Sequence, residues 1–169
     1  MSNENGLEIE RKFLIVMPDI AELSGIAGAE VSEITQTYLL AEPEVADRVR
    51  KRSYESKVVY TRTVKKRVSG MSAFEDEKVI SEEEYTQLLV NADKSKIPVK
   101  KTRCAIPFKG HILEIDIYPF WHKQAVLEIE LDSEQDTYCI PDYLKVIREV
   151  TGNRAYSNRA LSGVIPDED

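Results

Sequence analysis

The chain has 169 residues, of which 31% are charged and 42% hydrophobic, and it carries a formal net charge of −7. This length fits a single domain covering residues 1–169, and the acidic balance argues against nucleic acid and anionic membranes as partners. Two cysteines and two histidines suit neither a disulfide framework nor the usual zinc site. No apolar run is long enough to span a membrane and the N-terminus shows no secretory signal, so we expect a soluble cytoplasmic protein.

Strand-like segments dominate the chain, and helical spacing is confined to a few short stretches. Ser81 and Glu84 form a capping box that predicts the start of one helix, and Pro141 predicts the start of another. In chain order we expect a strand at 7–14, a helix at 17–25, a strand at 33–40, two strands within 46–70 joined around 54–57, a strand at 72–80, a helix at 81–92, a hairpin of strands at 97–108 and 111–120, a strand at 125–132, a helix at 141–150 and a terminal helix at 154–163. The predicted fold class is α+β, with about eight mostly antiparallel strands.

The expected strands share one arrangement of charge. Charged side chains recur at positions i and i+2, which places them on the same face of a strand, and most of these rows carry a single sign. The first strand combines Glu8, Glu10 and Lys12 in this way. The other rows are Arg48, Arg50 and Arg52; Thr61, Thr63 and Lys65; Glu75 and Glu77; Lys101 and Arg103; Glu114 and Asp116; and Glu128 and Glu130.

Two interpretations fit this alternation. In an ordinary amphipathic sheet the apolar face is buried and the charged face meets water. A solvated face normally mixes signs, however, because same-face neighbours along a strand lie only about 7 Å apart and like charges repel. Eight antiparallel strands can instead close into a barrel whose interior holds side chains or one small ligand. We therefore predict an eight-stranded antiparallel closed β-barrel, a charged tunnel whose apolar outside is covered by the helices at 81–92 and 141–150.

The segregated charges point to a particular chemistry. Clusters of carboxylate oxygens suit hard cations such as Mg²⁺ or Mn²⁺. Rows of guanidinium and ammonium groups suit phosphate. A tunnel with both would take a long, thin polyanion and support metal-assisted phosphoryl chemistry.

The segment Glu8-Ile9-Glu10-Arg11-Lys12 resembles the ExExK signature of the CYTH superfamily, the triphosphate tunnel metalloenzymes. Further motifs follow in that family's order along nearly the whole chain: Arg48-Val49-Arg50, Thr63-Val64-Lys65, Glu75-Asp76-Glu77, Lys101-Thr102-Arg103, Glu114-Ile115-Asp116 and Glu128-Ile129-Glu130. The resemblance implies an antiparallel tunnel, Mg²⁺ or Mn²⁺ as cofactor, and substrates that carry a triphosphate. Family members include inorganic triphosphatases, thiamine triphosphatases and class IV adenylate cyclases.

Carried over residue by residue, the resemblance implies roles for the charged rows. The catalytic group is Glu8, Glu10 and Lys12, with Lys12 at the water-activating or phosphate end. The phosphate-binding group is Arg48, Arg50, Lys65, Lys101 and Arg103, to which the strand register adds Arg52. The cation ligands are Glu8, Glu10, Asp116, Glu128 and Glu130, with Glu75, Glu77 and Glu114 as further ligands or immediately behind them. At the tunnel end, Tyr156 or Arg159 of the terminal helix is expected to reach the substrate, whereas Arg62, Lys66 and Arg67 are expected to point outward.

The function expected from the sequence is metal-dependent hydrolysis of a linear triphosphate, a small-molecule partner, with inorganic tripolyphosphate ahead of nucleoside or thiamine triphosphate. One alternative is a class IV adenylate cyclase that forms cyclic AMP from ATP. Another is a non-catalytic module that binds polyphosphate or nucleotides. An organic triphosphate would require an aromatic contact at a tunnel mouth, for which Tyr118, Trp121 and Tyr156 are candidates. The sequence is compatible with a homodimer.

Overall fold

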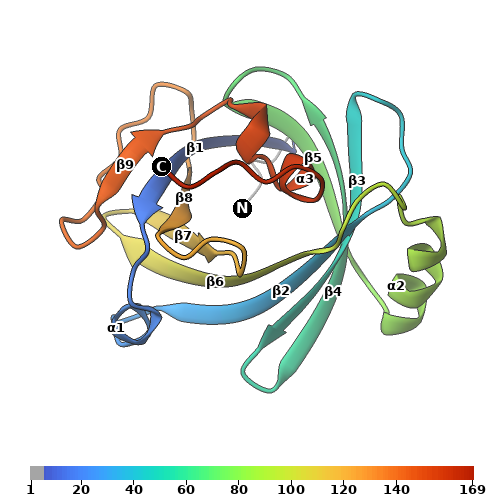
Figure 1. The fold of residues 1–169 in the computed structure, drawn as a ribbon, viewed down its shortest axis with the longest axis horizontal. Helices are drawn as coiled ribbons and strands as arrows, with labels where there is room; N and C mark the ends of the chain where they lie inside the picture. The colour runs from blue at the N-terminus through green and yellow to red at the C-terminus, as the bar shows by residue number, and fades with distance from the viewer. Residues whose placement is uncertain (1–5) are drawn as a thin grey trace.

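The computed structural model describes residues 6–169, so residues 1–5, where no secretory signal is expected, lie outside the described part. Strands make up most of the fold (Figure 1). The elements are β1 (Leu7–Val16), α1 (Ile20–Ser24), β2 (Glu30–Tyr38), β3 (Val45–Tyr54), β4 (Lys57–Arg67), β5 (Ser72–Ile80), α2 (Glu82–Leu88), the 3₁₀ turn η1 (Leu89–Asn91), β6 (Val99–Phe108), β7 (His111–Ile117), β8 (Gln124–Glu130), β9 (Val146–Glu149), the 3₁₀ turn η2 (Arg154–Tyr156) and α3 (Asn158–Leu161).

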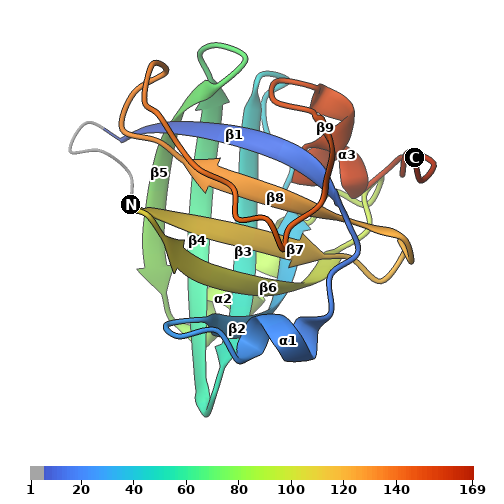
Figure 2. The same ribbon diagram turned by 90° about the vertical axis from the view of Figure 1, so that its left-hand side faces the viewer.

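Eight of these strands form a closed antiparallel barrel, as the sequence predicts. The strand order is β5-β4-β3-β2-β6-β7-β8-β1-β9, and a further pairing between β5 and β1 closes the ring. That closure is short, because only Leu7–Ile9 of β1 pair with β5 before β9 takes over the same edge of β1. In Figure 2 the strands β1, β6, β7 and β8 cross in front of β3, β4 and β5, as the tilted walls of a small barrel do.

The charged faces of the strands point inward and most apolar faces point outward, which confirms the inside-out barrel. The outer core covers β1, β6, β7 and β8 with residues such as Phe13, Ile106 and Leu127. It is sealed by Leu23 of α1 and by Leu144, together with partly buried side chains of the segment between β8 and β9. The apolar side chains of these strands are thus buried on the outer surface of the barrel, beneath α1 and the segment between β8 and β9. Ionic groups line much of the interior.

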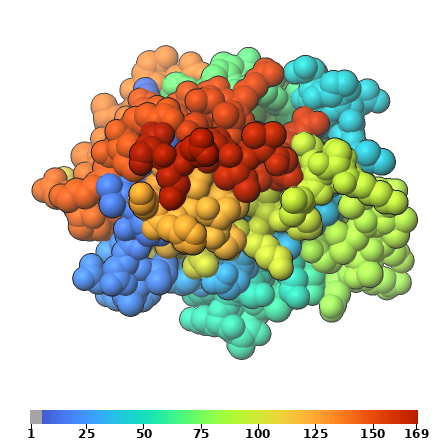
Figure 3. Space-filling model, viewed as in Figure 1, coloured from blue at the N-terminus to red at the C-terminus, as the bar shows by residue number. Residues whose placement is uncertain are grey.

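A second apolar cluster fills part of the barrel interior. Leu14, Val126 and Tyr118 pack there against residues that come from the C-terminal segment, including Tyr156 and Leu161. The space-filling view shows the C-terminal residues spread over the middle of this face of the molecule (Figure 3). The interior is therefore closed on this side by η2 and α3, and the ionic part of the tunnel lies beside this plug.

Two predicted helices are wrong or incomplete. Residues 146–149 form strand β9 instead of a helix, because the edge of β1 that β5 has left, Phe13–Ile15, needs a pairing partner. The predicted helix at 154–163 is two short pieces, η2 and α3, because Ser157 is extended and its side chain caps α3. Residues 141–150 therefore cover the barrel without a helix, through Leu144 in the turn before β9.

The remaining helices largely match the expectation. Ser81 caps α2 by accepting a hydrogen bond from the backbone N–H of Glu84, as the capping box predicts. Residues 81–92 contain α2 and η1, and α2 lies on the outside of β3 and β4, where Tyr85 packs against Tyr60. Neither element contains a fully buried residue, so this helix covers the barrel only in part. None of the helices within residues 6–169 has the length and apolar composition needed to cross a bilayer.

Candidate active site

The barrel interior contains a cavity of about 770 Å³ lined largely by charged side chains. All the site residues predicted from the sequence line this cavity except Lys101, Asp116 and Tyr156. The lining members are Glu8, Glu10, Lys12, Arg48, Arg50, Arg52, Lys65, Glu75, Glu77, Arg103, Glu114, Glu128, Glu130 and Arg159. Charges from seven different strands therefore meet around one enclosed volume.

The strand register places several acidic rows beside basic rows. Glu75 of β5 lies opposite Lys65 of β4, and Asp116 of β7 lies opposite Arg103 of β6. Lys65 Nζ donates to Glu8 Oε2 at 2.5 Å and lies 3.8 Å from Glu75 Oε2. Ion pairing between strands therefore offsets part of the like-charge repulsion that each row shows on its own.

Acidic residues oppose one another at two places in the wall formed by β7, β8 and β1. Glu10 lies opposite Glu130, and Glu114 lies opposite Glu128. Lys12 lies between two of these carboxylates, with Nζ 3.7 Å from Glu10 Oε1 and 3.5 Å from Glu128 Oε1. Directly opposed carboxylates destabilise a sheet unless a positive charge lies between them, so this wall is the most acidic part of the cavity.

The pKa values of these groups follow from their surroundings. Burial, reinforced by the negative charge of Glu128, raises the pKa of Glu10 to about 7. Burial also tends to raise the pKa of Glu128, but Lys12 and Arg103 outweigh it and hold that pKa well below its usual range. The pKa of Lys12 is raised because Glu128 and Glu10 outweigh its own burial. One wall thus holds both an ionised carboxylate and a carboxyl group that takes up a proton near neutrality.

The oxygen donors of this wall suit a hard cation in chemistry. Glu128 Oε1 and Glu75 Oε2 are buried and receive no hydrogen bond within the described residues. In residues 6–169 no three acidic, histidine or cysteine side chains converge into a ready-made metal site. The carboxylates are instead drawn toward Lys12, Lys65 and Arg103, so a cation would take the place of these ammonium and guanidinium partners.

Arginines of β3 form the opposite, basic wall. Arg50 donates from Nε and Nη2 to Gln36 Oε1, at 2.8 and 2.5 Å. Burial and the neighbouring charges of Arg48 and Arg103 lower the pKa of Arg50 to about 10, which leaves it charged at neutral pH. Arg52 also lines the cavity, as its register predicts, and pairs with Glu30.

Lys101 and Asp116 form an ion pair beneath the cavity instead of in its wall. Lys101 Nζ donates to Asp116 Oδ2 at 2.6 Å, and neither side chain is exposed. Burial tends to raise the pKa of Asp116, but Arg103 and Lys101 outweigh it and lower that pKa. The sequence expectation that these two side chains line the tunnel is not met, because the C-terminal plug covers them: Asn158 Oδ1 accepts from both Lys101 Nζ and the Tyr118 hydroxyl.

The tunnel-end residues take two different positions. Arg159 lines the cavity and donates to the backbone carbonyl of Pro43, at the turn between β2 and β3. Tyr156 is buried in the plug, where its hydroxyl accepts from Arg148 and its backbone carbonyl accepts from Lys12 Nζ at 3.4 Å. The side chain of Tyr156 therefore does not reach the cavity.

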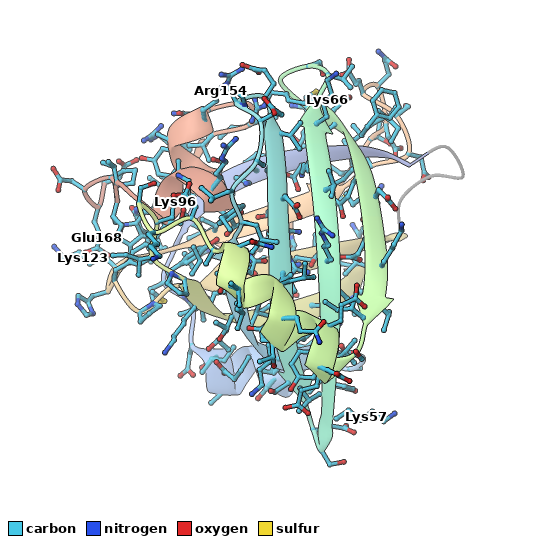
Figure 4. All side chains as sticks on the ribbon, turned by 90° about the vertical axis from the view of Figure 1, so that its right-hand side faces the viewer. Lys57, Lys66, Lys96, Lys123, Arg154 and Glu168 are labelled. Atoms are coloured by element: carbon cyan, nitrogen blue, oxygen red, sulfur yellow. The ribbon has the colours of Figure 1, made fainter. Side chains whose placement is uncertain are left out.

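Some wall residues were not predicted. Arg67 was expected to point outward but lines the cavity, whereas Arg62 does point outward and pairs with Asp47. Tyr38 and Arg154 also line the cavity and Gln36 lies behind Arg50, and none of the three belongs to a charge repeat that would single it out. Figure 4 places Arg154 at the same end of the barrel as Lys66 and opposite Lys57, so this end carries additional positive charge. The sequence offers no signal for this role, because Arg154 falls at the start of the terminal helix expected at 154–163 and belongs to no charge repeat.

A smaller cavity of about 160 Å³ continues from the main one and shares Arg50, Arg52, Arg103 and Glu114 with it. Its remaining lining is aliphatic. Tyr118 and Trp121, considered above as contacts for an organic group, are instead buried in the plug with Tyr156. Tyr38, itself buried, is the aromatic residue among the described residues that line either cavity.

Solved structures share this architecture. The chain is 25% identical to the inorganic triphosphatase NE1496, with a TM-score of 0.55 over 95% of this chain and 97% of that one. This shared fold is consistent with the resemblance of the chain to the CYTH superfamily of triphosphate tunnel proteins. The tunnel fold is also shared with PH1819 of Pyrococcus horikoshii, at 20% identity and a TM-score of 0.58 over 76% of this chain and 80% of that one.

A plant protein has the same tunnel fold. HpAC1 of Hippeastrum, a candidate adenylyl cyclase described as having a dominant triphosphatase activity, is 17% identical with a TM-score of 0.50 over 75% of this chain and 80% of that one. At this identity the likeness concerns the fold alone. No family model and no curated protein sequence matches the chain.

Proposed function

We propose that this protein is a CYTH-type triphosphatase that hydrolyses the terminal phosphoanhydride of inorganic tripolyphosphate, with Mg²⁺ or Mn²⁺ as cofactor. The observation that carries the proposal is the main cavity of about 770 Å³, in which a basic wall faces an acidic one. A linear polyanion needs the first wall, and a hard cation needs the second. The fold relative NE1496, an inorganic triphosphatase, supports the same substrate class.

In this proposal the basic wall binds and orients the substrate. Arg48, Arg50 and Arg103 present planar guanidinium groups that suit bidentate contacts with phosphate, and Lys65 adds a point charge. Fixing the chain of phosphates in one direction supplies the alignment that in-line attack needs. The closed barrel excludes most bulk water, which strengthens each of these contacts.

The acidic wall would hold the cation through Glu10, Glu128 and Glu130, with Glu8 and Glu75 next to it. When bound, such a cation stabilises negative charge that develops on phosphate oxygens and lowers the pKa of water. Lys12 lies close to Glu10 and Glu128 and, as a charged ammonium group, would donate a hydrogen bond to a phosphate oxygen. In the metal-free protein the pKa of Glu10 is raised to about 7, so binding of a cation at neutral pH would displace a proton from this carboxyl group.

The structure favours an inorganic substrate over an organic one. Adenosine or thiamine would need an uncharged pocket with a stacking surface, and the residues 6–169 that line the two cavities offer only the buried Tyr38 as an aromatic group. We therefore rank hydrolysis of tripolyphosphate above hydrolysis of nucleoside or thiamine triphosphate and above formation of cyclic AMP.

Phosphate release from tripolyphosphate, ATP, GTP and thiamine triphosphate tests the proposal, with Mg²⁺, with Mn²⁺ and with EDTA. We expect cation-dependent release from tripolyphosphate that is lost in Glu10→Ala and Glu130→Ala, and retained in Glu149→Ala, a surface carboxylate paired with Arg11. Cyclic AMP and pyrophosphate from ATP would instead identify a cyclase. Tight binding of tripolyphosphate without any turnover would identify a non-catalytic module.

A further inference from the structure

The positive side chains of the tunnel differ in their partners. Ion pairs with carboxylates hold most of them: Lys12 with Glu10 and Glu128, Arg52 with Glu30, Lys65 with Glu8, Lys101 with Asp116, and Arg103 with Glu114 and Asp116. Among the described residues, Arg48 and Arg50 are the predicted phosphate-binding groups that make no ion pair. These two guanidiniums face the cavity with their charge uncompensated by a direct carboxylate contact.

Both arginines instead lie opposite neutral residues of the neighbouring strand β2. Gln36 lies opposite Arg50 in the register, and its Oε1 accepts from Nε and Nη2 of that guanidinium. Tyr38 lies opposite Arg48 in the register and lines the cavity with it, and the Nε of Arg48 makes no hydrogen bond within the described residues. Amide and phenol oxygens accept hydrogen bonds without bringing a full negative charge.

The next pair along the same strands shows the contrast. Arg52 lies opposite Ile34, which offers no acceptor, and its guanidinium turns to the carboxylate of Glu30. Gln36 itself is fully buried, and its Nε2 has no hydrogen-bond partner within residues 6–169. A buried amide with an unused donor is costly for stability, so its presence behind Arg50 calls for a reason other than packing.

We propose that Gln36 is a positioning residue that fixes the Arg50 guanidinium toward the substrate while leaving its positive charge available to phosphate. This inference rests on the proposed function and deepens it. The two bonds to Gln36 occupy Nε and one hydrogen on Nη2, so the donors on Nη1 are left to the cavity. Arg50, with Arg48 beside it, thereby forms the part of the tunnel that binds the polyanion even before a cation is present.

The size-matched variant Gln36→Glu separates orientation from charge. Glutamate preserves the acceptor oxygen but adds a negative charge that competes with phosphate for Arg50. We expect it to weaken the affinity for tripolyphosphate, measured by calorimetry in EDTA, about tenfold or more. Gln36→Leu removes the acceptor without adding charge, and we expect it to weaken binding less while lowering kcat more than it raises KM.

The matched control is Thr35→Glu, which adds the same charge one residue earlier on the outer face of β2, opposite Lys51 and Lys100. This variant is expected to bind tripolyphosphate as the unaltered protein does. The affinity ratio between Gln36→Glu and the unaltered protein should return toward one as acidification protonates the new carboxyl group, an effect that a purely structural role would not produce.

The outcomes distinguish the inference from the function on which it rests. If the unaltered protein neither binds nor hydrolyses tripolyphosphate, the proposed function fails. If the unaltered protein does both, two results would overturn the role of Gln36 while leaving the proposed function intact. One is that Gln36→Glu binds tripolyphosphate as tightly as the unaltered protein. The other is that Thr35→Glu weakens binding as much as Gln36→Glu does. Should Gln36→Glu fail to fold, an unchanged kcat and affinity in Gln36→Leu would overturn the role by itself.

Discussion

Lys101 Nζ lies 2.6 Å from Asp116 Oδ2, and neither side chain has exposed surface. The pair is not symmetric, because Asp116 also accepts from Arg103 Nε at 2.7 Å. Loss of the aspartate therefore leaves Lys101 without a carboxylate partner and Arg103 with Glu114 and Glu128, whereas loss of the lysine leaves the aspartate paired with Arg103. Removing one partner of a buried ion pair typically costs about 3–5 kcal/mol.

We predict that Asp116→Asn lowers the free energy of unfolding by about 3–5 kcal/mol and that Lys101→Met lowers it less. Urea denaturation measures both. Asp76→Asn is the control, since Asp76 makes an exposed pair with Lys78 and its loss should cost less than about 1 kcal/mol. Equal costs for Asp116→Asn and Asp76→Asn would show that the buried pair does not hold the barrel together.

The carboxyl group of Glu10 predicts a pH dependence of stability. Its pKa is raised from 4.5 to about 7 in the folded protein, so between these values the folded state binds more protons than the unfolded state. The free energy of unfolding should therefore fall as pH rises from 4.5 to 7 and level off above. For the metal-free protein we expect Glu10→Gln to remove this slope and to be more stable above pH 7 by about 1–3 kcal/mol. Parallel pH profiles for the two proteins would contradict this.

The inner and outer faces of most strands were predictable from the sequence because side chains alternate strictly along a strand. Glu128 and Glu130 point inward while Leu127 and Ile129 point outward, as their spacing alone requires. The spacing of residues along a strand does not predict how deep in the barrel a side chain lies. Asp116 follows the inward rule, yet it lies under the C-terminal plug, and that contact depends on residues far away in the chain.

The strand β9 was missed for a related reason. Residues 141–150 begin with Pro141 and carry helix-forming residues, so local propensity predicts a helix. Val146 and Arg148 form a strand because β1 presents an unpaired edge at Ile15 and Leu14 after β5 departs. Gln36 was missed because a neutral residue on an inward face gives no charge pattern; only the register with Arg50 reveals its role.

The gap between β5 and β9 is closed by two glycines, and this predicts a sensitive position. Gly152 has a φ of +74°, and a Cβ there would lie 3.1 Å from the backbone oxygen of Gly70. Gly110 also has a positive φ, +86°, but open space around it. We expect Gly152→Ala to destabilise the protein more than Gly110→Ala, which should cost only about 1–2 kcal/mol for its backbone conformation. Thermal unfolding compares the two, and equal melting temperatures would exclude close packing at this seam.

The acidic wall predicts where a cation binds. In calorimetric titrations with Mn²⁺, Glu130→Gln should weaken binding about tenfold or more, because it removes a carboxylate that faces Glu10. Glu149→Gln, on the outer surface, is the matched control and should leave the affinity unchanged. Binding that survives in Glu130→Gln would place the cation elsewhere in the tunnel.

Arg48 and Arg52 line the same face of β3 but differ in their partners, so their substitution should have different effects. Arg52 is held by Glu30, and Arg48 makes no ion pair within the described residues. We expect Arg48→Gln to weaken tripolyphosphate binding about tenfold or more, as loss of an available buried charge does, and Arg52→Gln to weaken it less. The carboxylate of Glu30 neutralises part of the charge that Arg52 could offer to phosphate.

Removing the carboxylate that pairs with Arg52 should strengthen tripolyphosphate binding instead of weakening it. Glu30→Gln removes the competing carboxylate without changing the size of the side chain, and the freed guanidinium then resembles Arg50 with its neutral partner. Tripolyphosphate affinity in EDTA should therefore rise in Glu30→Gln, and adding Arg52→Gln to this variant should abolish the gain. If Glu30→Gln binds no more tightly than the unaltered protein, pairing with carboxylates is not what sets which arginines of the tunnel hold phosphate.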